Sequence, residues 1–314
     1  MRVVFFGTSP FAVPTLQALH DSAHEVLAIV TQPDRPAGRG MQLAESAVKK
    51  AARALGYESI LQPEKVRRKP FPEELVALAP DVLVVISFGQ IIPQRVLDIP
   101  KYGGINVHAS LLPRWRGAAP IHRAIMAGDS ETGVATMQME ASLDTGPVFL
   151  EARTPILPTD TTLSLEPRLA DAGAALLIQT LDRLAHEPQW QPTPQGEDGM
   201  TYAAMLTRED GFLNPTAESA TPLANRVRAL TPRPAGVILL AGKEVKILEA
   251  IALPATEPDV PGKIVAVTKE GIELATVEGI LRLVTVQPPG KPAMAATAYA
   301  NGARLKPGDL AASP

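Results

Sequence analysis

"MRVVFFGTSPFAVPTLQALHDSAHEVLAIV" (residues 1–30) alternates two continuous apolar runs with one helical pattern. The apolar runs lie at 3–6 and 26–30, and apolar residues recur at helical spacing over 11–20 between them. Unbroken Val and Ile runs are typical of strands that helices cover on both faces of a parallel sheet. The stretch therefore predicts a strand–helix–strand unit.

The same rhythm continues through the next 150 residues. A helical pattern spans 73–79, a strand follows at 82–87, another is expected at 104–108, and a long helix is expected over 164–185. This alternation predicts an α/β domain over residues 1–187, built on a doubly wound, Rossmann-like parallel sheet.

The last third of the chain has a different pattern. Pro, Gly and Gln are frequent over 186–203, which is typical of a linker, and we assign 188–205 to it. A helix is expected over 219–230, before five short strands at 236–240, 245–250, 263–267, 271–276 and 280–286. Short strands separated by turns predict a small β-barrel as a second domain, residues 206–314.

Composition narrows the class of protein. The 314 residues include no cysteine, which excludes disulfides and thiolate chemistry, and they contain no apolar run long enough for a signal peptide or a membrane span. We expect a cytoplasmic protein with no membrane contact and no obligate protein partner. The formal net charge is −3, but residues 31–69 carry nine Lys or Arg against four Asp or Glu. Charge alone leaves the partner undecided.

Two polar side chains stand at the end of the strand expected at 104–108. Asn106 and His108 are two residues apart, so both point to one face of the strand. Asparagine can donate a hydrogen bond to an oxyanion, and histidine can move a proton near neutral pH. Asp144, in "SLDTGP", could orient or stabilise His108. Together these three residues suit the attack of an amine on a carbonyl group.

Other interpretations of these residues remain open. A histidine at a strand end is often structural, and Asp before Thr-Gly is often only a turn residue. The histidines lack the close spacing of a metal site, so we expect no metal. "GTSPFA" after the first strand has one glycine where a dinucleotide fold needs three, and no Gly-x-Ser-x-Gly hydrolase motif surrounds Ser87 or Ser110.

The motif "NVHASLLPRWRGAAP" with "LDTG" after it resembles the formyltransferases that use 10-formyltetrahydrofolate. "TQPDRPAGRG" at 31–40 and the barrel-like second part resemble the members of that family whose acceptor is an aminoacylated tRNA. The resemblance implies transfer of the formyl group to the free α-amine of initiator methionyl-tRNA, for translation initiation.

The resemblance also implies roles for particular residues. Asn106, His108 and Asp144 would be the catalytic set, and the segment formed by Ser110, Leu111, Leu112 and Pro113 would bind the folate. Arg35 and Arg39, in the loop 34–42, would contact the acceptor arm of the tRNA, and the second domain would be an OB-like barrel that holds more of it.

The chain departs from the family pattern in two places. Met41 and Gln42 stand where relatives often have lysines, and Asn214-Pro215 stands where they often have Asp-Trp. From residue 206 onward there are twelve basic and eleven acidic residues, which is unlike a strongly basic tRNA platform. Three alternatives remain open: formyl transfer to a small amine such as an amino sugar, a folate- or RNA-binding protein without catalysis, and a nicotinamide-dependent dehydrogenase.

Overall fold

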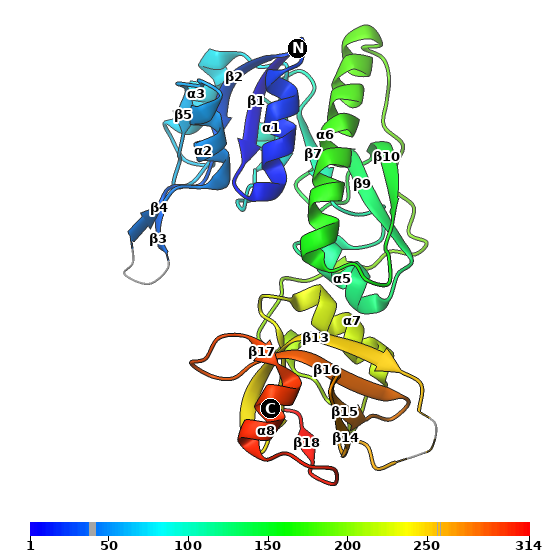
Figure 1. Cartoon of the computed structure of the whole chain (residues 1–314). Helices are drawn as coiled ribbons and strands as arrows, with labels where there is room; N and C mark the ends of the chain where they lie inside the picture. Colours follow the sequence, from blue (N-terminus) through cyan, green and yellow to red (C-terminus); the bar gives the residue numbers. More distant parts are fainter. Residues whose placement is uncertain (38–41, 256, 258) are drawn as a thin grey trace. The chain divides into compact units, whose positions relative to one another are not determined.

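The structure is a computed structural model that describes residues 1–37, 42–255, 257 and 259–314. It divides into two compact units (Figure 1). The first unit comprises Met1–Pro120, Glu131–Pro155 and Glu166–Ala203. The second unit comprises Ile121–Ser130, Ile156–Leu165 and Ala204–Pro314.

A seven-stranded sheet forms the centre of the first unit, in the order β10-β9-β7-β6-β1-β2-β5. Its parallel strands are β1 Arg2–Gly7, β2 Glu25–Val30, β5 Ile60–Leu61, β6 Val82–Ile86 and β7 Gly104–His108. The expected strands at 3–6, 26–30, 82–87 and 104–108 are therefore confirmed.

Two further strands, which the sequence pattern does not predict, extend the sheet beyond β7. They are β9 Glu131–Gln138 and β10 Val148–Pro155, and both run antiparallel to their neighbours. An antiparallel edge on an otherwise parallel sheet is common in α/β folds. Because β9 pairs with β7, β7 is an inner strand of the sheet, and His108 lies opposite Ala135.

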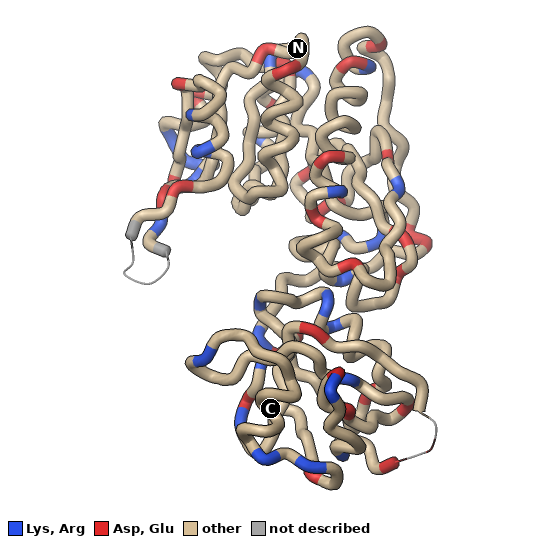
Figure 2. The backbone as a smooth tube through the Cα atoms, in the orientation of Figure 1, with Lys and Arg blue, Asp and Glu red and all other residues tan. Residues whose placement is uncertain are grey.

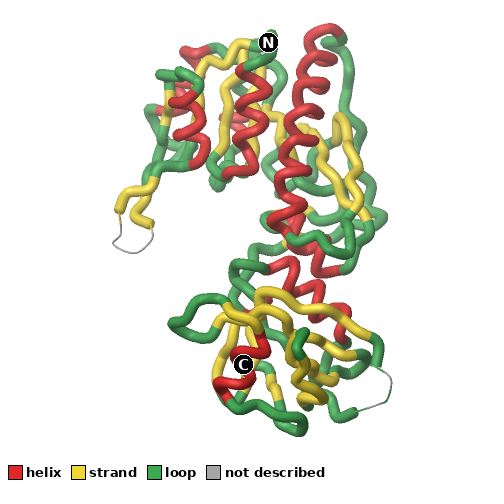
Figure 3. The backbone as a smooth tube through the Cα atoms, viewed as in Figure 1, coloured by secondary structure: helices red, strands yellow, loops and turns green. Residues whose placement is uncertain are grey.

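Helices pack on this sheet and bury both of its faces. Val4 and Phe6 of β1 belong to one buried cluster with Phe71 and Leu75 of α3, while Phe5, which points to the other face, is also fully buried. The helical elements of this part of the chain are η1 Pro10–Ala12, α1 Val13–His20, α2 Ala47–Ala54, α3 Phe71–Leu78, α4 Gln94–Leu97, α5 Pro120–Ala127 and α6 Thr162–His186. Figure 3 shows this alternation of helix and strand along the chain.

The loop expected at 34–42 begins and ends in strand. β3 Arg35–Ala37 and β4 Gln42–Ala44 pair antiparallel as a hairpin. Asp34 fixes the start of this hairpin, because its carboxylate accepts hydrogen bonds from Lys49 Nζ at 2.5 Å and Gln62 Nε2 at 2.8 Å. These bonds, from Lys49 first, hold the pKa of Asp34 below its usual value. Arg39 lies outside the described residues.

The segment expected to be a linker contains ordered pairing. β11 Tyr202–Ala203 lies parallel to β8 Arg116–Gly117, with Tyr202 opposite Arg116 and Ala203 opposite Gly117.

The described helices include none that is both long and apolar enough to cross a membrane.

A curled antiparallel sheet dominates the second unit, in the order β14-β15-β16-β13-β12-β18, with β17 paired to β16. The helix and the five strands expected from the sequence are confirmed, although β13 is longer than expected. The elements are η2 Glu209–Gly211, α7 Ala220–Leu230, β12 Gly236–Leu240, β13 Lys243–Leu253, β14 Ile264–Thr268, β15 Gly271–Ala275, β16 Ile280–Gln287, β17 Met294–Ala295, α8 Ala296–Ala303 and β18 Ala311–Ala312. Leu223 and Val227 of α7 pack into the sheet's core.

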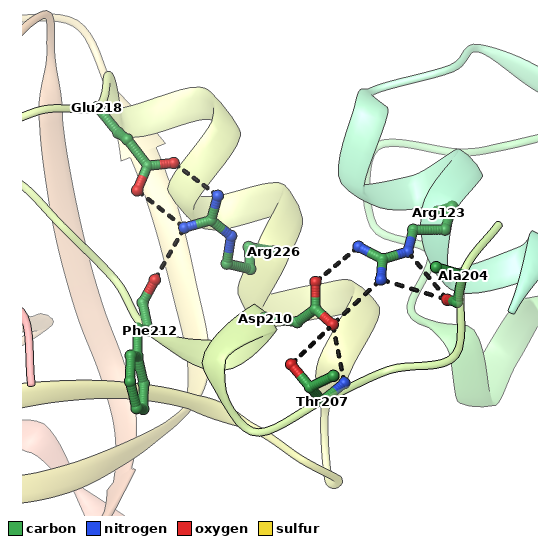
Figure 4. Close-up of polar contacts among 7 residues, drawn as sticks. All are labelled: Arg123, Ala204, Thr207, Asp210, Phe212, Glu218 and Arg226. Atoms are coloured by element: carbon green, nitrogen blue, oxygen red, sulfur yellow. Dashed lines mark hydrogen bonds and ion pairs between the residues drawn. The ribbon is translucent and has the colours of Figure 1, made fainter. Parts of the chain in front are cut away.

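An ion pair joins two separate segments of the second unit (Figure 4). The Arg123 guanidinium donates to both carboxylate oxygens of Asp210, at 2.7 and 3.1 Å, and Asp210 also accepts from the Thr207 backbone N–H at 2.8 Å. Burial alone would raise the pKa of Asp210, but the bonds from Arg123 and Thr207 outweigh it and hold the pKa below the usual value. The second unit is thus stabilised across residues 123 and 210, which are 87 positions apart.

Candidate active site

The end of β7 carries the polar residues singled out in the sequence. Ile105 and Val107 are buried and fix the strand, while Asn106 and His108 alternate with them and lie on the same face. In a parallel sheet, ligands bind beyond the carboxyl ends of the strands, and His108 is the last residue of β7. The fold therefore places both side chains at the edge where a ligand is expected.

His108 lies between a backbone carbonyl and a carboxylate. Its Nε2 is 2.9 Å from the Trp115 carbonyl oxygen, and its Nδ1 is 3.7 Å from Asp144 Oδ2. A carbonyl can only accept, so Nε2 carries a hydrogen and donates it. A separation of 3.7 Å is too long for a direct hydrogen bond. Nδ1 is thus the ring nitrogen that makes no hydrogen bond, and the Asp144 carboxylate lies beside it, although only 5% of His108 is exposed.

Asp144 is held in place by the loop that follows β7. Its Oδ2 accepts the Gly117 backbone N–H at 2.9 Å, and its own backbone has a φ of 50°, in the left-handed region. Residues other than glycine rarely adopt that conformation, although Asp tolerates it better than most. The carboxylate is therefore fixed toward His108 by a bond from Gly117 and by the shape of its own turn.

Asn106 is half-buried, and its side chain makes no hydrogen bond to any residue that the structure describes. The Asn106 N–H donor is therefore not used by the part of the chain that the structure describes.

A segment far along the chain supports this loop, and we call residues 195–203 the strap. Thr201 contributes two bonds, because its Oγ1 accepts the Trp115 N–H and its carbonyl accepts the Arg116 N–H, both at 2.9 Å. Gln195 Nε2 donates to the carbonyl oxygens of Asp144, at 2.9 Å, and Gly146, at 2.7 Å. The strap thus holds both backbone regions that orient His108 and Asp144.

Arg116 lies beneath the strap and is only 8% exposed. Its Nε and Nη2 donate to Gln195 Oε1 at 2.9 and 2.7 Å, and among the described residues it has no carboxylate partner. Burying an unpaired charge is costly unless it is hydrogen-bonded, so Gln195 compensates this guanidinium while it holds the Asp144 turn. The Arg114 guanidinium instead stacks on the Trp115 ring, 4.4 Å from its centroid.

The four residues expected to bind folate differ in their exposure to solvent. The Ser110 side chain is fully buried and its hydroxyl donates to the Arg114 carbonyl at 2.6 Å, while Leu112 packs in a small core with Ala135 and Met137. Leu111 and Pro113 are half-exposed. Ser110 and Leu112 therefore shape the segment, and Leu111 and Pro113 are the members with exposed surface.

The expected tRNA contacts lie elsewhere in the first unit. Arg35 is exposed in β3 and its Nη2 lies 3.3 Å from Glu64 Oε2, while Arg39 is outside the described residues.

No group of three His, Asp or Glu side chains suited to a metal ion occurs in the part of the chain that the structure describes.

Asn106, His108 and Asp144 thus come together, whereas Gln195 and Thr201 are site residues that the sequence analysis missed. Both lie in the Pro- and Gly-rich stretch taken as a linker. Nothing in their local pattern marks them, because their partners are 51 and 86 positions away.

Comparisons with known proteins identify the family of the chain. The model of the formyl transferase family matches residues 1–181, and that of the formyl transferase C-terminal domain matches residues 205–304. A curated relative from Halorhodospira halophila, named methionyl-tRNA formyltransferase, is 47% identical over 313 residues, which cover 98% of each chain.

Solved structures share the fold at low sequence identity. WlaRD, a sugar 3N-formyl transferase, has a TM-score of 0.66 at 16% identity, over 93% of this chain and 99% of its own. HypX from Aquifex aeolicus, in complex with tetrahydrofolic acid, has a TM-score of 0.63 at 17% identity, over 97% of this chain and 48% of its own. With both family models matched and a full-length relative at 47% identity, the chain belongs to the formyl transferase family, in the group whose curated members are named methionyl-tRNA formyltransferase.

Proposed function

We propose that the chain transfers the formyl group of 10-formyltetrahydrofolate to the free α-amino group of initiator methionyl-tRNA, giving N-formylmethionyl-tRNA for translation initiation in the cytoplasm. The observation that carries this proposal is the position of His108 Nδ1, which lies at the carboxyl end of β7 and 3.7 Å from the Asp144 carboxylate. The curated relatives' name supports the choice of acceptor.

His108 is the proton carrier in this reaction. The methionyl amine attacks the formyl carbon, a new C–N bond forms, and the carbonyl oxygen becomes an oxyanion. The amine then loses a proton to His108 Nδ1, since Nε2 is held by the Trp115 carbonyl. The C–N10 bond breaks, and the proton passes to N10 of the departing tetrahydrofolate. Asp144 stabilises the positive charge on the ring between these two transfers.

Asn106 stabilises the oxyanion. Its amide N–H is uncharged, lies on the same face of β7 as His108, and has no competing partner among the described residues. Where such a donor is preorganised, it is worth about 3–4 kcal/mol of barrier. The half-exposed Leu111 and Pro113 would contact the folate, on a segment whose shape Ser110 and Leu112 maintain.

The tRNA would be held by two parts of the chain. Arg35, with Arg39 from outside the described residues, would contact the acceptor arm. Residues 206–314 would form an OB-like tRNA-binding domain, joined to a catalytic domain of residues 1–187 through residues 188–205. The pairing of β11 with β8 gives that connecting segment a second role, as part of the strap.

A small amine acceptor is the second candidate, because WlaRD shares the fold and is a sugar 3N-formyl transferase. The chain's identity is 16% to WlaRD and 47% to the H. halophila relative, which favours the tRNA acceptor.

The test is to incubate the purified chain with 10-formyltetrahydrofolate and either initiator methionyl-tRNA or a nucleotide-linked amino sugar, and to identify products by mass spectrometry. We expect N-formylmethionyl-tRNA only, and a lower rate with Arg39→Ala. Formylated amino sugar would support the second candidate. Binding of tRNA or folate without any formylated product would instead indicate a protein without catalytic activity.

A further inference from the structure

A second basic surface lies in the first unit, outside the site described above. Four of the five residues from 65 to 69 are cationic and exposed: Lys65, Arg67, Arg68 and Lys69. We call these five residues the basic turn. They follow β5, whose carboxyl end lies on the same edge of the sheet as that of β7. Figure 2 shows Lys and Arg positions concentrated along this part of the chain.

The backbone of the basic turn is fixed. Val66, between the cations, is 1% exposed and its N–H donates to Gln90 Oε1 at 3.0 Å, while Gln90 Nε2 donates to the Pro63 carbonyl at 3.1 Å. The Arg68 N–H donates to the Lys65 carbonyl at 3.0 Å. A partner that binds here therefore orders little backbone, and most of its binding free energy is retained.

Most of these cations have no carboxylate beside them. Lys69 pairs with Glu73 at 2.5 Å, but Lys65, Arg67 and Arg68 make no ion pair with any described residue. Arg95 adds a fifth positive charge, because its guanidinium donates to the Arg67 carbonyl. Other exposed arginines of this unit are paired, as Arg53 is with Glu45 and Arg153 with Glu131. Lys65, Arg67 and Arg68 thus form a group of cations without ion-pair partners, although Glu64 and Glu74 lie nearby, and such a group attracts an anionic partner.

The surroundings indicate which partner fits. Arg35 of the β3–β4 hairpin, a proposed tRNA contact, reaches the basic turn's neighbour Glu64 at 3.3 Å. A pocket of about 500 Å³ is lined by Lys65, Arg68 and Lys69, by Glu64 and Glu74, and by the apolar residues Leu61 and Phe71. A row of cations beside a hairpin expected to bind RNA matches the spaced phosphates of a nucleic acid backbone.

We propose that the basic turn binds backbone phosphates of the tRNA acceptor, as a contact separate from Arg35 and Arg39. This rests on the proposed function for the identity of the RNA. Phosphate contacts position a nucleic acid without reading its sequence, so the basic turn contributes affinity and leaves the chemical step unchanged.

The test is the triple variant Lys65→Gln, Arg67→Gln and Arg68→Gln in the full chain. We expect the KM for methionyl-tRNA to rise about tenfold near 150 mM salt, with kcat and the KM for the formyl donor unchanged. Each lost phosphate contact lowers the salt slope by about 0.7–0.9, so log(kcat/KM) against log[salt] becomes shallower by about 2.

The matched control is Lys101→Gln, Arg153→Gln and Arg183→Gln, which removes three exposed charges from the same unit. If both triple variants show the same KM and salt slope, the proposal is wrong. The dissociation constant for methionyl-tRNA, measured by fluorescence anisotropy without formyl donor, separates this outcome from a failure of the proposed function. If the unmodified chain forms no product, but the basic-turn variant binds tRNA more weakly and the control variant does not, the proposed function is wrong and this proposal stands. Equal affinity in both variants would overturn it.

Discussion

The side chain of Gln195 is hydrogen-bonded to the backbone of Asp144, because Gln195 Nε2 donates to the Asp144 carbonyl oxygen at 2.9 Å. The same side chain accepts two bonds from Arg116. Gln195 therefore fixes the turn that aims the Asp144 carboxylate at His108, although it lies 51 residues further along the chain.

Replacing Gln195 tests this relationship. Because Gln195→Asn shortens the side chain by one carbon, we expect it to release the Asp144 turn while leaving an amide to compensate Arg116. Small displacements of catalytic groups cost about 10²-fold in rate, so kcat should fall by roughly 10 to 100-fold with little change in either KM. Gln191→Asn, at an exposed position, is the control and should retain full activity. An unchanged kcat in Gln195→Asn would mean that the strap has no positioning role.

Gly117 meets the strap directly. It has a φ of 124°, and a Cβ there would lie 2.7 Å from the Ala203 carbonyl oxygen. Gly117→Ala should therefore destabilise the chain by about 1–3 kcal/mol, measured as the free energy of unfolding in urea. Gly196→Ala has open space around it and no positive φ, so it should be close to neutral. Equal unfolding free energies in the two variants would contradict this packing.

The Asp144 carboxylate supplies charge as well as geometry. Asp144→Asn retains an oxygen that can accept the Gly117 N–H, so we expect normal folding. Loss of the negative charge beside His108 should lower kcat by about 10²–10³-fold, as removal of one preorganised electrostatic partner does. Steady-state formylation rates measure this, with Glu140→Gln as an exposed carboxylate control. A kcat within twofold of the unmodified chain would remove Asp144 from the mechanism.

The Arg123–Asp210 pair gives the second unit a pH dependence. The folded-state pKa of Asp210 lies below its usual 3.8, so the unfolded chain binds the proton more readily. The stabilisation is therefore complete above about pH 5 and is lost as the pH falls through the folded-state pKa.

We expect Asp210→Asn to lower the free energy of unfolding by about 1–3 kcal/mol near neutral pH. The difference from the unmodified chain should shrink below about pH 4. Urea unfolding from pH 3 to 7 measures this, and Glu278→Gln, an exposed carboxylate change, should show no such pattern. A difference that stays constant over this range would contradict the role assigned to the pair.

Much of the fold could be predicted because it follows from local patterns. The runs at 3–6 and 26–30 are apolar on both faces, which is typical of a covered parallel strand, and they form β1 and β2. The same reasoning missed β9 and β10. Their burial depends on β7 and on each other, and segments such as "ETGVATMQ" mix polar and small residues that fit several structures.

The site was predictable to the extent that its residues are close in sequence. Asn106 and His108 share a strand, so their common face follows from the spacing alone. The approach of Asp144 to His108 depends on the Gly117 N–H and on the strap, which are long-range contacts. The role of Gln195 could not be predicted for the same reason. Its side chain bonds backbone carbonyl groups, which any residue supplies.

The most direct test is the single-turnover rate of N-formylmethionyl-tRNA formation, with enzyme in excess and both substrates saturating, for the unmodified chain and His108→Ala. We predict rapid formation by the unmodified chain and a fall of about 10²–10⁴-fold in the variant, which should remain folded at the assay temperature although it loses the bond to the Trp115 carbonyl. A His108→Ala chain that forms the product at nearly the unmodified rate would contradict the claim that this ring carries the proton between the two nitrogens.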